Sequence, residues 1–393
     1  LGVGPESRVG LCLPRDQRLI PALLGVWWAG AAYVPLDPAF PSARLAAMVE
    51  DSGLRVVLGA GDYLGDHPGV TVLSYDDAVR GEPIPRVRVP AEAAAYTIFT
   101  SGSTGRPKGV TVTQGNVAAL LRAFRAVLPL SADDHLVAVT TLSFDISVLE
   151  LLLPLVCGAR VTVADTETAM DPNALRRLLR ESGATALQAT PATWRALVTS
   201  GGIPESVRLR LCGGEALPRD LAADLVADGA EVWNVYGPTE TTVWSAAGRV
   251  VPGEPVRIGP PIPGTRVYVL DDALRPVPTG VTGQVFIGGA GVARGYHDKP
   301  GLTAQRFVPD PFSDRGERLY ATGDLGRWDP DGRIELLGRI DHQVKLRGFR
   351  IEIEEIETTL RGCPGVADAA VALVTEPDPR LVAYVVLTAD HPD

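Results

Sequence analysis

A loop rich in glycine and hydroxyl side chains follows an apolar run near residue 100. The segment reads Tyr96-Thr-Ile-Phe-Thr-Ser-Gly-Ser-Thr-Gly-Arg-Pro-Lys-Gly-Val110. Its glycines let backbone N–H groups point into a concavity, its hydroxyls are short donors, and Lys108 adds a mobile positive charge. Because Lys108 follows Pro107 and precedes Gly109, the segment lacks the Gly-Lys-Ser/Thr order of a P-loop. It therefore predicts a phosphate-binding loop of another kind, with a flexible surface turn as the alternative.

Lysine is a rare residue in this chain. Among 37 basic side chains only Lys108, Lys299 and Lys345 are lysines. In a chain that otherwise uses arginine, a lysine inside this loop indicates that a compact, flexible ammonium group is needed there.

Glycine, proline and capping residues divide the chain up to about Arg249 into alternating helices and strands. We expect one helix that Ser42 caps and that ends before Gly53, a second that Asp171-Pro172 opens and that stops at Gly183, and a third that Pro218 starts and that stops at Gly229. The short apolar runs Leu136–Thr140 and Arg160–Val163 fit buried strands. This alternation predicts an α/β fold.

The pattern changes after Arg249. Short strands with dense proline and glycine follow, including Thr265–Leu270, Gln284–Ile287 and a hairpin at Asp331-Gly332. A helix at Glu354–Arg361 and strands at Ala369–Val374 and Leu381–Leu387 come after Asp341. We expect an α/β protein: a multi-subdomain core of mixed sheets flanked by helices over 1–340, with a small β-barrel-like subdomain at about 249–340, and a partial α+β subdomain over 341–393.

Composition excludes several classes of protein. The net charge of −10 argues against a nucleic-acid partner. Leu19–Leu36 carries no charge, but proline and glycine interrupt it, so it reads as a buried helix ending near Gly30 and a short strand, and no membrane is expected. Four scattered cysteines have no metal or redox spacing. Since the chain opens with leucine and no signal peptide is recognisable, we expect a cytoplasmic piece of a longer polypeptide.

Seven segments in order resemble the motifs of the adenylate-forming enzymes. Within that superfamily, the chain is similar over nearly its whole length to the amino-acid-activating adenylation domains of nonribosomal peptide synthetases. The segments are Trp28–Asp37, the loop at 96–110, Phe144–Ser147, Asn234–Glu240, Gly283–Tyr296, Tyr320–Leu325 and Gly338–Glu352.

The resemblance implies an ATP site. Activation requires a carboxylate oxygen to attack the α-phosphorus while pyrophosphate leaves, so catalysis is mostly positioning and charge neutralisation. Thr239 is implied to contact the α-phosphate, and Glu240 to bind Mg²⁺ with hard oxygen ligands. Without the preceding Tyr-Gly-Pro, this Thr-Glu pair would read as an ordinary helix start. The residues implied to hold the β- and γ-phosphates are Thr100, Ser101, Gly102, Ser103, Thr104 and Lys108.

The same resemblance implies how the nucleoside is bound. Tyr236 is implied to stack on adenine, Asp324 to accept hydrogen bonds from the ribose hydroxyls, and Arg339 to reach the nucleotide. A core tyrosine and a surface turn are the alternatives. The remaining implied nucleotide-binding positions are Gly213, Gly214, Glu215, Asn234 and Gly237.

Asp145 interrupts an apolar run, which makes it a candidate for binding the substrate's α-ammonium group. A buried acid needs a cationic partner, although a helix N-cap is also a reasonable role here. Relatives that activate fatty or aryl acids generally lack this aspartate. The side-chain pocket is implied to consist of Asp145, Ile146, Leu149, Gln188, Leu211, Gly213, Val235, Val243 and Trp244. Because the rest of this set is uncharged and bulky, we expect glycine as the substrate, with alanine next.

Asp341 matches the family's hinge, and the segment after it matches a loop that enters the site for a second half-reaction. In that step the phosphopantetheine thiol of a peptidyl carrier domain attacks the adenylate. His342 reads as a solvated neighbour of the hinge, while Gly348 would allow close approach. A condensation domain of the same assembly line is a further expected partner. The residues implied in catalysis are Thr104, Lys108, Thr239, Glu240 and Lys345.

Relative to the family, the chain lacks the opening segment and a late Asn-Gly-Lys motif whose lysine pairs with the reacting groups. We therefore expect either a fragment truncated at both ends or a domain that is catalytically weak as it stands. Two alternatives stay open: an acyl-CoA or aryl-acid ligase of the same superfamily, and a non-catalytic nucleotide-binding or docking domain.

Overall fold

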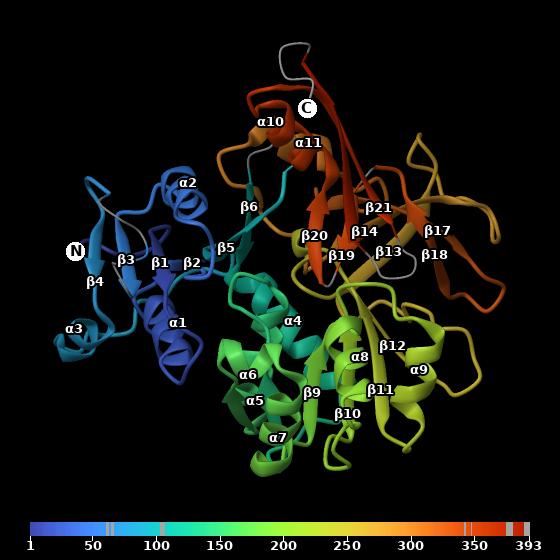
Figure 1. The fold of residues 1–393 in the computed structure, drawn as a ribbon, viewed down its shortest axis with the longest axis horizontal. Coiled ribbons are helices and arrows are strands. Elements are labelled where there is room, and N and C mark those ends of the chain that lie inside the picture. Colours follow the sequence, from blue (N-terminus) through green and yellow to red (C-terminus); the bar gives the residue numbers. More distant parts are fainter. Residues whose placement is uncertain are drawn as a thin grey trace.

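The structure is a computed structural model. It describes residues 1–59, 63, 67–102, 107–341, 343–346, 348–374 and 380–388, without the side chain of Phe349. Two large sheets with their helices form most of the molecule, and a smaller antiparallel sheet and a C-terminal unit lie against them (Figure 1).

The first sheet positions the predicted phosphate loop. Its strand order is β15-β6-β5-β2-β1-β3-β4. The antiparallel pair β5 and β6 aligns Thr100 with Lys108, so the loop at 101–107 connects two central strands. The strands are β1 (Arg8–Cys12), β2 (Ala32–Pro35), β3 (Val56–Gly59), β4 (Thr71–Leu73), β5 (Ala94–Thr100), β6 (Lys108–Thr113) and β15 (Gly295–Tyr296). The accompanying helices are α1 (Leu19–Trp28), α2 (Ser42–Ser52), α3 (Tyr75–Arg80) and α4 (Gln114–Val127).

The second sheet has the order β12-β11-β10-β9-β7-β8, parallel except for β12. The carboxyl ends of β9, β10 and β11 therefore meet at one edge, where ligands bind in open parallel sheets. The strands are β7 (His135–Ala138), β8 (Arg160–Val163), β9 (Ala186–Ala189), β10 (Leu209–Gly213), β11 (Glu231–Tyr236) and β12 (Ala246–Arg249). The helices are α5 (Ile146–Cys157), α6 (Thr166–Met170), α7 (Pro172–Ser182), α8 (Pro191–Thr199) and α9 (Arg219–Val226), and a 3₁₀ turn, η2 (Thr239–Thr241), follows β11.

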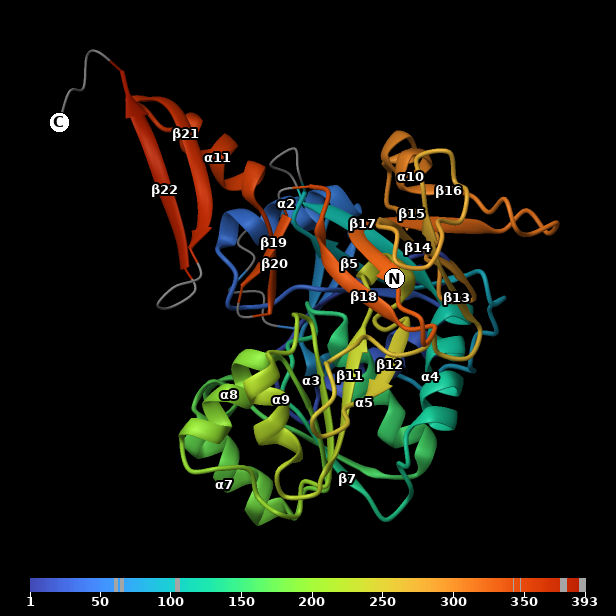
Figure 2. The same ribbon diagram turned by 90° about the vertical axis from the view of Figure 1, so that its right-hand side faces the viewer.

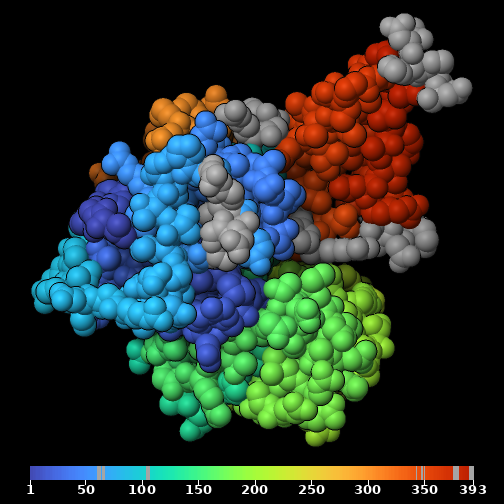
Figure 3. All heavy atoms as spheres, turned by 60° about the vertical axis from the view of Figure 1, so that its left-hand side comes forward, coloured from blue at the N-terminus to red at the C-terminus, as the bar shows by residue number. Residues whose placement is uncertain are grey.

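The rest of the chain forms the third sheet and the C-terminal unit. The third sheet contains β13 (Thr265–Leu270), β14 (Gly283–Gly289), β16 (Phe307–Pro309), β17 (Arg318–Trp328) and β18 (Ile334–Arg339), with α10 (Pro300–Arg306) beside it. The C-terminal unit contains the hairpin of β19 (Gln343–Leu346) and β20 (Phe349–Glu352), then α11 (Ile353–Arg361), β21 (Val366–Val374) and β22 (Arg380–Leu387). β21 and β22 project from the molecule, whereas β19 and β20 lie against it (Figures 2 and 3).

Most predicted elements are confirmed, although several of their boundaries differ from the prediction. Asp171 caps α7 by accepting from the Asn173 N–H, and the left-handed Gly183 ends that helix. Ser42 is the first residue of α2 and caps nothing, because Pro41 occupies the N-cap position. Helix α9 ends at Val226, before the predicted stop at Gly229.

The sequence also bears on the state of the cysteines and on membrane crossing. All four cysteines are free thiols, as their spacing indicated. In the described part of the chain, no helix combines the length and apolarity that a bilayer crossing requires.

Candidate active site

Four charged residues, three of them buried and one partly buried, alternate in sign where β6, η2 and β20 meet. Lys108 is 8% exposed, and Glu240 is fully buried. The Lys108 Nζ lies 3.5 Å from Glu352 Oε1. Arg350 donates to both carboxylate oxygens of Glu240, at 3.2 and 3.0 Å. Each charge therefore has an opposite neighbour, which buried charges require.

Tyr296 from β15 completes this cluster. Its hydroxyl donates to Glu240 Oε1 at 2.8 Å, and the Lys108 Nζ lies 5.4 Å from its ring centroid. Burial, the largest effect, would raise the pKa of Glu240, but the charges of Arg350 and Lys108 lower it to about 2. Burial lowers the pKa of Lys108, and the nearby Arg350 lowers it further.

Two further contacts seat the β19–β20 hairpin on the core. The Ser101 hydroxyl donates to the Arg350 carbonyl at 2.9 Å, and the Gly348 N–H donates to the Glu215 carboxylate. Gly348 has φ +84°, and a Cβ there would lie 2.9 Å from Thr190 Cγ2. This position therefore favours glycine both for its backbone and for the close approach. Lys345, on β19, is exposed.

The residues predicted to bind the nucleoside form one hydrogen-bonded group. The Tyr236 hydroxyl donates to Asp324 Oδ2 at 2.5 Å, and Arg339 Nη1 donates to Asp324 Oδ1 at 2.6 Å. Arg339 also pairs with Asp341, the predicted hinge residue, at 2.6 Å. Asn234 does not join them, because its amide donates to the Arg257 carbonyl at 2.8 Å and anchors a loop.

Asp145 precedes α5 but does not cap it. Its side chain makes no capping hydrogen bond, so that alternative is wrong. The residue is 3% exposed, and its Oδ2 has no hydrogen-bond partner among the described residues. Burial raises the pKa of Asp145 to about 6, opposed by a hydrogen bond with Thr239 and helped by the charge of Glu240. A buried, unpartnered carboxylate oxygen is suited to a cationic group.

The predicted pocket residues converge beside Asp145. Trp244 follows two residues with positive φ, Thr242 and Val243, and its indole lies across Gly213, where a Cβ would be 2.6 Å from Cη2. A void of about 10 Å³ remains next to Leu149, Gln188 and Leu211. The other pocket side chains are at most 3% exposed: Ile146, Leu149, Gln188, Leu211, Val235, Val243 and Trp244. Apart from Asp145, these residues are uncharged, and their side chains are buried.

Some predicted residues are not described by the structure, and some residues at the site were not predicted. Ser103, Thr104 and His342 lie outside the described residues. Arg350, Glu352 and Tyr296 were not predicted to have a role, although all three lie in the motifs quoted above. The spacing of Arg350 and Glu352 offers a signal, because residues two apart in a strand share a face.

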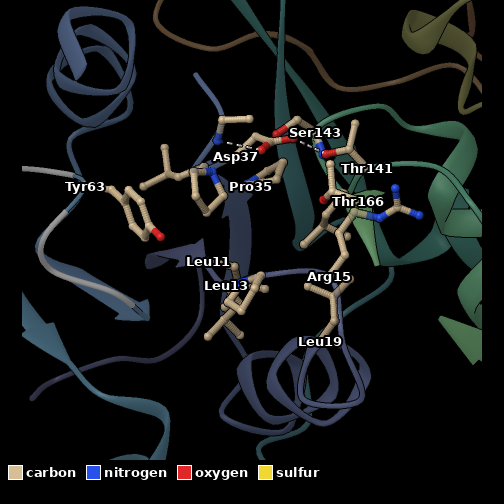
Figure 4. A pocket seen from close by; sticks show the side chains of 15 residues that line it. Leu11, Leu13, Arg15, Leu19, Pro35, Asp37, Tyr63, Thr141, Ser143 and Thr166 are labelled. Atoms are coloured by element: carbon tan, nitrogen blue, oxygen red, sulfur yellow. Dashed lines mark hydrogen bonds between the residues drawn. The ribbon is translucent and has the colours of Figure 1, made fainter. Parts of the chain in front are cut away.

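A separate cavity of about 290 Å³ lies at the carboxyl ends of β1 and β2 (Figure 4). Leucines and prolines form much of its lining, and none of the predicted site residues borders it. Its acid, Asp37, accepts a hydrogen bond from the Thr141 hydroxyl at 2.5 Å. We assign no chemistry to this cavity.

Glu240→Gln should loosen the β19–β20 hairpin. The change removes the charge that balances Arg350, and breaking a buried pair costs about 3–5 kcal/mol. Hydrogen exchange of the β20 amides should rise at least about tenfold, since Arg350 can recover its solvation only if the hairpin lifts. The pair should persist down to low pH: its contribution is present above pH 4.5 and is lost as the pH falls towards 2.

The matched control is Asp220→Asn, which breaks the exposed 2.5 Å pair with Arg195. Exposed pairs contribute little, so β20 exchange should not change in that variant. Unaltered β20 exchange in Glu240→Gln would show that the charge cluster does not hold the hairpin.

Comparison with known proteins agrees with this site. The family model described as AMP-binding enzyme matches residues 1–297. A dimodular nonribosomal peptide synthase of Bacillus subtilis (strain 168) is 47% identical over 99% of this chain, which corresponds to 17% of that protein. Phosphinothricin tripeptide synthetase PhsC of Streptomyces viridochromogenes is 42% identical over 98% of this chain and 36% of that protein. The chain thus spans a minor part of these relatives.

Solved structures indicate the same family as the sequence comparisons. The four-domain nonribosomal peptide synthetase holo-AB3403, bound to AMP and glycine, matches with a TM-score of 0.78 and 40% identity over 98% of this chain and 30% of that one. NpsA-ThdA, an artificially fused adenylation-PCP didomain from Klebsiella oxytoca, matches with a TM-score of 0.86 and 29% identity over 98% of this chain and 79% of that one. The chain belongs to the AMP-binding enzyme family, among the adenylation domains of nonribosomal peptide synthetases.

Proposed function

We propose that this domain activates glycine as glycyl-AMP and then transfers the glycyl group to the phosphopantetheine thiol of a peptidyl carrier domain. The observation that carries the proposal is the unpartnered Oδ2 of Asp145 beside buried, uncharged and mostly bulky side chains. An ammonium group would supply the missing partner, and bulky pocket side chains favour the smallest amino acid. The bound glycine in a structure 40% identical to this chain supports the same substrate.

In the first half-reaction, a glycine carboxylate oxygen attacks the α-phosphorus of ATP. The bond between this phosphorus and the bridging oxygen breaks, and pyrophosphate leaves with the electron pair. Asp145 holds the ammonium group, Thr239 lies next to the α-phosphate, and Lys108 neutralises the departing phosphates. Asp324 holds the ribose and Tyr236 lies against adenine. These residues act by position and charge.

The protein itself offers only part of a magnesium site. Glu240 provides a hard, ionised carboxylate, and no group of three or more potential ligand side chains converges in the described part of the chain. Most of the ion's ligands would therefore be phosphate oxygens and waters, as is usual for Mg²⁺ with nucleotides. When bound, the ion would neutralise charge on the phosphates and on the leaving pyrophosphate.

The β19–β20 hairpin occupies the groups that the first half-reaction needs. Arg350 pairs with Glu240, and Glu352 pairs with Lys108. We infer that the hairpin moves away about Asp341 during adenylation and returns once pyrophosphate has left. In the second half-reaction, the carrier's thiol loses its proton and its sulfur attacks the glycyl carbonyl. AMP leaves as the carbon–oxygen bond breaks, while the Lys345 segment guides the arm.

Two other functions are distinguishable from this one. An acyl-CoA or aryl-acid ligase would have no amine to pair with Asp145, and the buried carboxylate would then remain uncompensated. A non-catalytic docking domain would bind nucleotide without turnover. The unpartnered Oδ2 of Asp145 argues against the first, and nucleotide turnover would exclude the second.

Glycine-dependent exchange of labelled pyrophosphate into ATP is the direct test. It should proceed in the domain within its complete synthetase module, and Asp145→Asn should raise the KM for glycine at least about tenfold because the charge partner of the ammonium is gone. The KM should also rise as the pH falls through about 6, where Asp145 becomes protonated and can no longer pair with the ammonium group.

Asp37→Asn is the control, since Asp37 lines the separate cavity. Its KM for glycine should match the wild-type value. A wild-type enzyme that prefers phenylalanine, leucine or a charged amino acid would contradict the glycine assignment and leave the family unchanged.

Lys345→Ala and Gly348→Leu should separate the two half-reactions. Both residues lie on the hairpin rather than on the core, so transfer of glycine to the carrier should slow while glycine-dependent exchange stays close to wild type. Radiolabelled glycine on the carrier domain measures the first quantity. Equal losses in both assays would mean that the hairpin has only a structural role.

A further inference from the structure

The amide of Gln188 is fixed in one orientation between α5 and Trp244. Its Nε2 donates to the Ile146 carbonyl at 3.0 Å and to Glu150 Oε1 at 3.1 Å. Its Oε1 accepts from Trp244 Nε1 at 2.9 Å. Because both amide hydrogens have oxygen acceptors, rotating the amide would place N–H groups against the indole N–H. The residue is 1% exposed, so water cannot compensate for such a rotation.

Glu150 lies behind Gln188, one turn along α5 from Ile146, and is fully buried. Its Oε2 accepts from the Val139 and Thr140 N–H groups at 2.7 and 3.0 Å. Its Oε1 accepts from the Thr140 hydroxyl at 2.5 Å, in addition to Gln188. The carboxylate thus has four donors and no free oxygen. It ties the end of β7, helix α5 and the Gln188 amide into one rigid unit.

The indole of Trp244 is held at both ends. Nε1 bonds to Gln188, while Cη2 presses towards Gly213, where no Cβ intervenes. The void of about 10 Å³ bordered by Glu150 and Gln188 is no larger than one water requires, so the Gln188 side chain has little space to turn. The indole wall of the pocket therefore stays in place as long as the Gln188 amide does.

We propose that Glu150 sets the size of the amino-acid pocket by fixing the Gln188 amide and, through it, the Trp244 indole. This inference rests on the proposed function, because it names what makes the site selective for the smallest amino acid. Glu150 is a positioning residue, since it lies behind the pocket wall. Excluding a single methyl group by pocket shape gives only about 10- to 200-fold discrimination, so a small movement of the wall is enough to change it.

Glu150→Gln in the complete synthetase module tests the proposal. The new amide places N–H groups against the donors of Thr140 or Gln188, so the Gln188 amide loses its fixed orientation. We expect kcat/KM for alanine to rise relative to glycine by about tenfold, mainly through KM. Gln188→Met removes the amide while keeping a side chain of similar length, so it takes away the acceptor of the Trp244 N–H and should give a similar shift. The double variant should shift the ratio no further than either single variant, because both interrupt one path.

Asp134→Asn is the matched control. Asp134 is also a buried carboxylate, 1% exposed, with donors from Ser131, Thr185 and Arg208 at the opposite end of β7. Its loss should lower the melting temperature without changing the alanine-to-glycine ratio. A ratio that stays at the wild-type value in a folded Glu150→Gln protein would overturn the proposal, as would additive effects in the double variant.

Should Glu150→Gln fail to fold, Thr140→Val removes one of its donors with a milder effect and decides the question by the same ratio. A wild-type enzyme that selects another amino acid would contradict the glycine assignment. The proposal would then require Glu150→Gln to accept larger substrates than the wild type, and an unchanged amino-acid spectrum would refute it.

Discussion

Glu240 is a fully buried carboxylate that must be paired with positive charge, and the arrangement of the site follows from this requirement. Arg350 and Lys108 satisfy it in the structure, and Glu352 in turn balances Lys108. On the proposed function, Mg²⁺ and nucleotide phosphates would bring charges of the same sign as Arg350 and Glu352. The hairpin and Mg·ATP would then be alternative partners of Glu240 and Lys108.

The need of a buried carboxylate for partners also distinguishes two other acids, Asp145 just before α5 and Glu150 within it. Glu150 has four hydrogen-bond donors and is fully satisfied by the protein. Asp145 is buried with one oxygen left open. Desolvation raises the pKa of both groups, and only Asp145 remains available to a ligand. In our proposal, Glu150 supports the pocket wall and Asp145 provides its charged end.

From the sequence, roles in the site could be proposed only where the chemistry is contained in short motifs. Lys108, Tyr236 and Asp145 could be selected from their immediate neighbours, and the α/β order followed from glycine and proline positions such as Gly183. The capping role of Ser42 was wrong because α2 begins one residue earlier than that role requires, so that Ser42 is its first residue and Pro41 holds the N-cap position.

Pairings between distant segments could not be predicted. The bond between Arg350 and Glu240 joins residues 110 positions apart, and no local pattern encodes it. Glu150 stands in the apolar run of α5, where a buried acid implies partners without identifying them. Three of its four donors come from the segment after β7 and the fourth from Gln188 on β9, which only the fold brings near.

The competition between the hairpin and Mg·ATP can be measured as a distance. Spin labels at Thr358→Cys on α11 and Ala223→Cys on α9, with the exposed Cys363 replaced by serine, would report the position of the C-terminal unit. We expect one distance distribution without nucleotide and a different one with a saturating non-hydrolysable Mg·ATP analogue. If the distribution stayed unchanged with the analogue demonstrably bound, the hairpin and Mg·ATP would not compete for Glu240 and Lys108.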